Sequence, residues 1–105
     1  APSLRNSIKD ATKSIAVVPT ENGCKYLQQL CKHWSHKLEV ELGEKSGVVR
    51  FGEAVATMRA DDQALTVEIE ASSPDVLERM KGVVSSHLDR FAFREAPLPF
   101  DWKAA

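Results

Sequence analysis

Two histidines three residues apart, His33 and His36, are the first side chains in this sequence whose types and spacing could do chemistry. At that spacing they are neighbours on a helix surface and could share a metal ion. Two helical histidines supply only half of a metal site, and no carboxylate stands at a suitable offset on the same stretch. We therefore favour two solvated residues near a helix C-terminus, where histidine is favourable in any case. The metal site remains the alternative.

His87 has a different setting. It follows Val83 and Val84 by one helical turn, within the apolar stripe of a second predicted helix. A histidine there is at least partly buried and needs a hydrogen-bond partner, such as a carbonyl oxygen or an acidic side chain. We expect a structural core histidine, and the alternative is a histidine in a functional cleft.

Arg90 and Arg94 lie on or just past the same helix. A guanidinium fits a carboxylate or a phosphate, so the two arginines could help to line an anion-binding groove, with Lys32, Lys37 and His33 opposite. Pairing with the acidic residues nearby (Asp89, Glu95 and Asp101) is the interpretation that we favour, since surface ion pairs are common and individually weak. The sequence assigns no catalytic residue, and its candidate ligand-binding residues are His33, His36, His87, Arg90 and Arg94.

The two cysteines, Cys24 and Cys31, are seven residues apart. On a helix this spacing separates their Cα atoms by about 10 Å, more than the roughly 7 Å that a disulfide can span. Cys31 stands on the predicted core stripe beside Trp34, without a general base facing it. We therefore expect free thiols in a reducing compartment, with Cys31 acting as a small buried hydrophobic residue.

Two helices must position these side chains. Apolar residues recur with helical spacing from about Glu21 to Lys37, and Thr20 is the expected N-cap. The core stripe of this helix comprises Leu27, Leu30, Cys31, Trp34 and Leu38. A second helix should begin at Pro74, with Ser73 as its N-cap, and run to about Phe91 or Phe93.

Between the helices the pattern changes to strands. Ser14–Val18 is small and β-branched, and Pro19 ends it. Apolar and polar residues then alternate over 38–42, 48–51, 54–60 and 65–71, with turns at 43–47, 52–53 and 61–63. This alternation predicts a sheet with one buried and one wet face. The wet face should carry Glu39, Glu41, Arg50, Arg59, Glu68 and Glu70.

The element order is strand, helix, four strands, helix, which predicts an α+β fold. Four short strands with tight links should form an antiparallel meander, with the first strand pairing at its edge and both helices on one face. This is a TATA-box-binding-protein-like topology, a name that implies no DNA binding. A ferredoxin-like sandwich is the alternative. We expect a flexible or short helical arm over 1–13, a single domain over 14–95, and an extended tail over 96–105 that Phe100 and Trp102 anchor to the domain.

Composition limits the function. The net charge of −1 in 105 residues argues against nucleic-acid binding, which needs a basic face. No apolar run approaches the roughly 20 residues that span a bilayer, and the first residues lack the apolar region of a secretory signal. We therefore expect a cytoplasmic monomer or homodimer that binds neither nucleic acid nor membrane, and the sequence requires no cofactor.

Three stretches, Tyr26–Lys37, His87–Glu95 and Asp101–Trp102, resemble the bacterial family catalogued as domain of unknown function 2218. The resemblance covers about residues 12 to 103. It implies a small bacterial protein, because members stand alone or are attached to siderophore-interacting, flavin-dependent ferric reductases. It therefore also implies a link to iron handling, with such a reductase as a partner, and it assigns no reaction.

The sequence thus predicts a non-enzymatic module that binds a ligand or partner. The family resemblance links this module to iron or siderophore metabolism. One alternative is a small haem- or metal-binding protein or enzyme that uses His87 with Arg90 or Arg94, which requires a pocket beside His87. Another is a structural module that dimerises through a sheet edge or exposed aromatic side chains.

Overall fold

A sheet and two helices make up the fold in a computed structural model, which describes residues 12–92, 94–95, 98 and 100–104. Most of the predicted arm over 1–13 lies outside these residues. In chain order the elements are β1 (Lys13–Pro19), α2 (Gly23–Trp34), β2 (Glu39–Leu42), β3 (Ser46–Arg50), β4 (Ala54–Ala60), β5 (Ala64–Ala71), α3 (Pro74–Phe91) and β6 (Lys103–Ala104).

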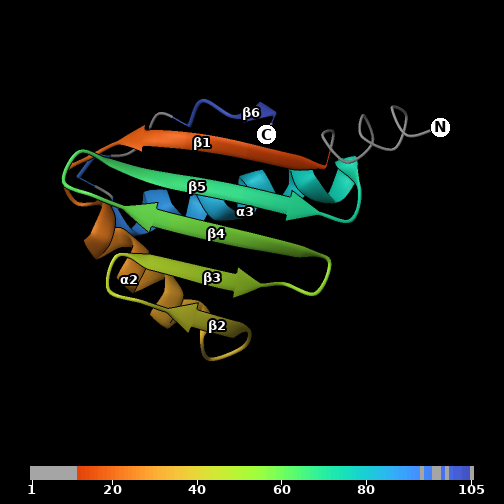
Figure 1. The fold of residues 1–105 in the computed structure, drawn as a ribbon, viewed down its shortest axis with the longest axis horizontal. Coiled ribbons are helices and arrows are strands. Elements are labelled where there is room, and N and C mark those ends of the chain that lie inside the picture. The colour runs from red at the N-terminus through yellow and green to blue at the C-terminus, as the bar shows by residue number, and fades with distance from the viewer. Residues whose placement is uncertain (1–11, 93, 96–97, 99, 105) are drawn as a thin grey trace.

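The sheet has the strand order β2-β3-β4-β5-β1-β6, and all of its pairs are antiparallel (Figure 1). The predicted meander is therefore present, and β1 pairs with β5 at its edge. Because the four middle strands are separate, the ferredoxin-like alternative is wrong. The C-terminal tail contributes a strand that the sequence did not predict: β6 pairs with β1, and the Ser14 hydroxyl donates a hydrogen bond to the Lys103 carbonyl at 2.9 Å.

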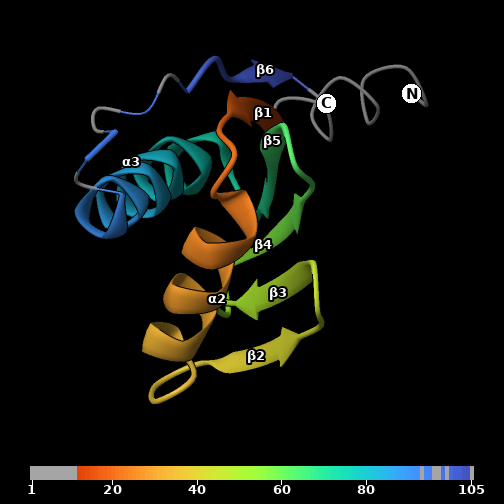
Figure 2. The same ribbon diagram turned by 90° about the vertical axis from the view of Figure 1, so that its left-hand side faces the viewer.

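Both helices cover one face of the sheet, as the sequence predicted (Figure 2). The alternating residues of the strands point toward them, and the opposite face is wet. On that wet face the Arg50 guanidinium pairs with the Glu41 carboxylate, and Lys13 Nζ lies 3.8 Å from Glu68 Oε2. The largest fully buried side chains are Val18, Leu27, Leu30, Cys31, Val49, Met58, Leu65, Val67, Ile69, Val84 and Leu88.

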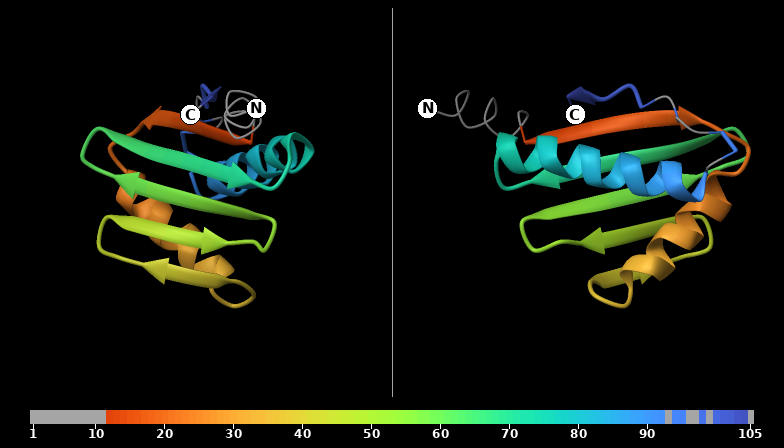
Figure 3. Two further views of the ribbon diagram at one scale, coloured as in Figure 1. Left: turned by 45° about the vertical axis from the view of Figure 1, so that its right-hand side comes forward. Right: turned by 180° about the vertical axis from the view of Figure 1, so that it is seen from behind.

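Helix α3 begins as predicted. The Ser73 hydroxyl accepts a hydrogen bond from the Val76 amide at 3.2 Å, and Pro74 occupies the first turn. The helix runs along the sheet, and its C-terminal end lies against α2 (Figure 3). Residues near Phe91 therefore face α2.

Helix α2 is shorter than predicted at both ends. Residues 35–37 form a turn, so His36 lies beyond the helix. The predicted N-cap, Thr20, does not cap it. Asn22 stands at the cap position without a side-chain cap bond, and the Thr20 hydroxyl instead bonds the Glu95 carboxylate at 2.9 Å. The Thr20 oxygen also accepts a hydrogen bond from the Asn22 amide at 3.1 Å, so this hydroxyl connects the residues just before α2 to Glu95.

Gly47 lies inside β3 and is not part of the turn that the sequence placed at 43–47. It allows α2 to approach the sheet closely, because a Cβ atom at this position would lie 2.6 Å from Cys31 Sγ. Gly52 lies in the turn between β3 and β4 with a φ of 90°, a backbone conformation that other residues rarely adopt. Among the residues that the structure describes, no helix is both long and apolar enough to cross a membrane.

Candidate functional site

Four rings meet where the C-terminal half of α2 crosses the end of α3. The His87 ring lies 5.1 Å from the ring of Trp34 and 5.7 Å from that of His33, measured between centroids. His33 also meets Phe91 edge-on at 5.8 Å. We call these four residues (His33, Trp34, His87 and Phe91) the ring cluster. It joins two helices at the rim of the core, where Trp34 is buried, His87 and Phe91 are half-buried and His33 is exposed.

His87 is half-buried and oriented by a backbone bond. Its Nδ1 lies 2.7 Å from the Val83 carbonyl oxygen, which can only accept, so Nδ1 carries the proton. In the described part of the chain no buried side-chain nitrogen or oxygen lacks a partner, and the structure gives no hydrogen bond to the other ring nitrogen, Nε2. Nε2 is therefore open to solvent and is a free acceptor.

Beside His87 is a hollow of about 160 Å³, lined by Ser86, His87 and Arg90. We call it the His87–Arg90 hollow. Pockets for drug-sized ligands begin at about 300 Å³. This hollow therefore has room for a small ion or a few waters and is too small to enclose a haem.

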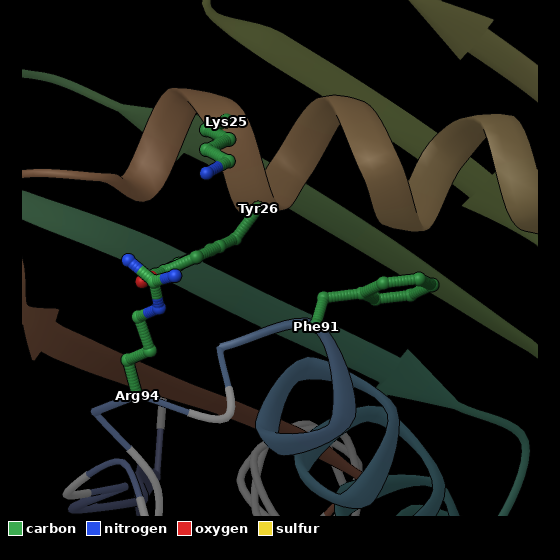
Figure 4. Close-up of a pocket in the computed structure, with 4 residues that line it drawn as sticks. All are labelled: Lys25, Tyr26, Phe91 and Arg94. Carbon is green, nitrogen blue, oxygen red and sulfur yellow. The ribbon is translucent and has the colours of Figure 1, made fainter.

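A second hollow, of about 170 Å³, lies between the start of α2 and the end of α3 (Figure 4). Lys25 and Tyr26 line it from α2, and Phe91 and Arg94 line it from the end of α3 and the turn that follows. Figure 4 shows the Arg94 guanidinium beside the hydroxyl end of the Tyr26 ring. We call it the Lys25–Arg94 hollow. It combines two cations with two aromatic rings.

Glu95 fixes the wall of this hollow. The Tyr26 hydroxyl donates to its carboxylate, as do the Thr20 hydroxyl and the Asn22 side-chain amide at 3.2 Å. These bonds, that from Tyr26 first, lower the pKa of Glu95. The same bond raises the pKa of Tyr26, with burial as a second cause. The carboxylate ties the residues after α3 to the start of α2, and so places Arg94 next to Tyr26.

The candidates chosen from the sequence are divided by the structure. His33 and His87 come together, Arg90 joins His87 in one hollow, and Arg94 lies in the other. His36 is exposed in the turn after α2 and lines neither hollow. Within the described residues, no group of three or more His, Cys, Asp or Glu side chains is arranged to hold a metal ion.

Sequence reasoning missed Lys25, Tyr26 and Phe91 as lining residues. Tyr26 lies outside the predicted core stripe of its helix, Phe91 fits the apolar stripe of the second helix, and Lys25 has the spacing of a solvated residue. Only the crossing of the helices places them around one hollow. The signal available in the sequence was the position of Tyr26 on the flank of its helix.

The cysteines act as the sequence predicted. Both thiols are free, so no disulfide links them. Burial raises the pKa of Cys31 to about 11, which keeps it protonated at neutral pH. The half-buried Cys24 donates from Sγ to the Glu44 carbonyl at 3.2 Å. Neither arrangement contains an activating base.

The comparisons with known proteins agree with the fold. Residues 15–103 match the family described as "Uncharacterized protein conserved in bacteria (DUF2218)". A solved structure, the NMR structure of PA4090 from Pseudomonas aeruginosa, is similar over 90% of this chain and 97% of its own, with 34% sequence identity and a TM-score of 0.77. The chain matches no curated protein. Because the family match covers nearly the whole chain, this protein belongs to the DUF2218 family of bacterial proteins.

Proposed function

We propose that this protein is a non-enzymatic binding module that takes an anionic aromatic group into the Lys25–Arg94 hollow. The observation that carries the proposal is the lining of that hollow, in which two cations and two aromatic rings stand around one space. A cation attracts the negative group of such a ligand, while the rings pack against its apolar surface.

The size of the hollow supports a single ring. At about 170 Å³ it is close to the roughly 150 Å³ that holds benzene inside a protein. A larger ligand would place one ring there and leave the remainder in solvent or along the ring cluster. This arrangement suits a module that recognises part of a molecule rather than enclosing the whole.

The charge around the hollow also favours an anion. Glu95 is the carboxylate nearest to Tyr26, and it already accepts hydrogen bonds from three side chains. Lys25 is exposed, and Arg94 brings a second positive charge from the other side. Lys25 and Arg94 thus bring two positive charges to this hollow, while the negative charge of Glu95 is spread over its three donors.

The class of ligand to test first comes from what the family resemblance implies, a link to iron and siderophores. Catecholates and hydroxybenzoates are aromatic anions with a single ring of this size, and they bind ferric iron through paired oxygens. We propose such a group, carried by a siderophore, as the ligand, a siderophore-interacting ferric reductase as the protein partner, and the cytoplasm as the location.

The test is a titration of the labelled protein with 2,3-dihydroxybenzoate, followed by amide NMR shifts. For about eleven non-hydrogen atoms at a few tenths of a kcal/mol each, the expected dissociation constant is about 1 mM. The shifts should centre on Tyr26 and Phe91. Lys25→Gln should weaken binding several-fold, because it removes one of the two cations.

Lys32→Gln is the matched control, since Lys32 is also exposed on α2 but lies outside the hollow. It removes the same charge and should leave the dissociation constant within about twofold. Equal weakening by both variants would mean that overall charge, and not the hollow, attracts the ligand. Shifts confined to the wet face of the sheet would contradict the proposal outright.

A further inference from the structure

We propose that His33 and His87 form a two-histidine site for a divalent transition metal ion, such as Ni(II) or Zn(II), that links α2 to α3. The proposal concerns a different ligand and different residues from the aromatic anion in the Lys25–Arg94 hollow, so either can fail alone. It also differs from the pair that sequence spacing suggests, His33 with His36. Because the helices cross, the histidine next to His33 is His87, which lies 54 positions further along the chain, and not His36.

The separation of the two rings fits a shared ion. Imidazole nitrogen binds zinc at about 2.0–2.1 Å, which puts each ring centroid about 3 Å from the ion. Two rings on one ion are then about 5–6 Å apart for the usual angles at the metal. The His33 and His87 centroids are 5.7 Å apart, with ring planes inclined at 44°. The centroid separation therefore matches that of two imidazoles on one ion, and the exposed His33 side chain can turn its ring toward that ion.

His87 has the tautomer and orientation of a metal ligand. Its Nδ1–H donates to the Val83 carbonyl, which leaves the unprotonated Nε2 for an ion. Metal-binding histidines commonly donate the other N–H to a carbonyl in this way, because the bond fixes the ring and raises its basicity. Nε2 is open to solvent, so an ion with its waters can reach it.

The two imidazole donors determine which class of metal ion binds here and how tightly it binds. Two imidazoles suit zinc, nickel and copper better than magnesium or calcium, which prefer oxygen. The described residues offer no third ligand from a His, Cys, Asp or Glu cluster, so water completes the coordination. Arg90, which lines the His87–Arg90 hollow beside His87, repels a cation. We therefore expect micromolar and exchangeable binding, weaker than that of a structural zinc site with four protein ligands.

Trp34 supplies a reporter for this site. Its indole lies 5.1 Å from the His87 ring and is buried, so a paramagnetic Ni(II) ion on His87 should quench its fluorescence. The other tryptophan, Trp102, stacks on Phe100 in the C-terminal tail. Trp102→Phe removes its signal, and the remaining emission then comes from Trp34 alone.

The experiment titrates the Trp102→Phe protein with NiCl₂ and follows Trp34 emission, with calorimetry using ZnCl₂ as a second measurement. We expect saturable quenching with one ion per chain. Changes in the groups that support metal ligands already cost about 10–100-fold in affinity. His33→Ala and His87→Gln, which each remove a ligand, should therefore weaken binding at least tenfold.

His36→Ala is the matched control, because His36 is an exposed histidine at the end of the same helix that the ring cluster does not include. It should leave the titration unchanged. Equal loss in His36→Ala and His33→Ala would assign the ion to the sequence-adjacent pair and overturn the proposal, as would quenching that no single variant alters. His33 is exposed, so His33→Ala keeps the test valid even if His87→Gln perturbs folding.

Discussion

The two flanks of α2 are built differently. The flank that faces β3 and β4 is dry: Leu27, Leu30 and Cys31 have no exposed surface, and Gly47 lets the helix approach within contact of the sheet backbone. The flank that faces α3 is open: His33 is exposed, and it meets the half-buried Phe91, which lines the Lys25–Arg94 hollow.

This difference separates folding from binding within one helix. On the dry flank every atom has close neighbours, so any change of volume alters the free energy of unfolding. On the open flank the ring contacts are tilted or edge-on, and the His33 side chain is exposed to solvent. Substitutions there should change what the protein binds while leaving its stability almost unchanged.

The largest expected effect tests this contrast directly with two truncations on α2. Leu30→Ala removes a fully buried side chain and should lower the free energy of unfolding by about 2–5 kcal/mol. His33→Ala removes an exposed ring and should change it by less than about 0.5 kcal/mol. Urea unfolding followed by circular dichroism measures both. A comparable loss in His33→Ala would mean that the α2–α3 flank is as much a part of the core as the sheet flank.

A smaller effect probes the close approach on the dry flank. Gly47→Ala places a methyl group where Cys31 Sγ leaves only 2.6 Å, and such overpacking typically costs about 1–3 kcal/mol. Removing the sulfur with Cys31→Ala should recover part of this loss, so the double variant should be more stable than the two single losses predict. Simple additivity in urea unfolding would show that strain in β3, and not the sulfur, causes the loss.

Local sequence was sufficient for most of the elements, except β6 and the ends of α2, and insufficient for the site. The cap at Ser73–Pro74 and the alternation through Leu65, Val67 and Ile69 depend on neighbours in sequence, and both appear as predicted. The α+β order followed because short links leave few ways to pair four strands.

The candidate site depends on partners far apart in sequence. Tyr26 and Glu95 are separated by 69 residues and Thr20 and Glu95 by 75, so no local pattern predicts that these three side chains are hydrogen-bonded together. Likewise, the pairing of His33 with His87 follows from the angle at which the helices cross, which no periodicity records. Side-chain chemistry identified His87, Arg90 and Arg94, which line the two hollows, and only the tertiary packing showed that Arg90 joins His87 while Arg94 lies in the other hollow.

The smallest expected effect concerns the polar corner at the end of the open flank, where Glu95 accepts its three hydrogen bonds. Its pKa is lowered from the usual 4.5, chiefly by the Tyr26 hydroxyl. The stabilisation is therefore present above about pH 4.5 and is lost as the pH falls through the lower pKa of the folded state. Glu95→Gln should reduce stability at pH 7 and much less at pH 3, in thermal melts over this range.

Two comparisons make this result specific to the corner. The pKa of Asp61 is also lowered, by hydrogen bonds from the amides of Gln63 and Ala64, so Asp61 also loses its stabilising effect as the pH falls. This part of the loss of stability in acid should remain in the Glu95→Gln protein. Glu21→Gln removes an exposed carboxylate near the same helix end and should leave the pH dependence unchanged. If Glu95→Gln and Glu21→Gln gave the same profile, the hydrogen bonds to Glu95 would add nothing beyond charge. The open flank of α2 would then have no polar anchor, and the position of Arg94 in its hollow would depend on packing alone.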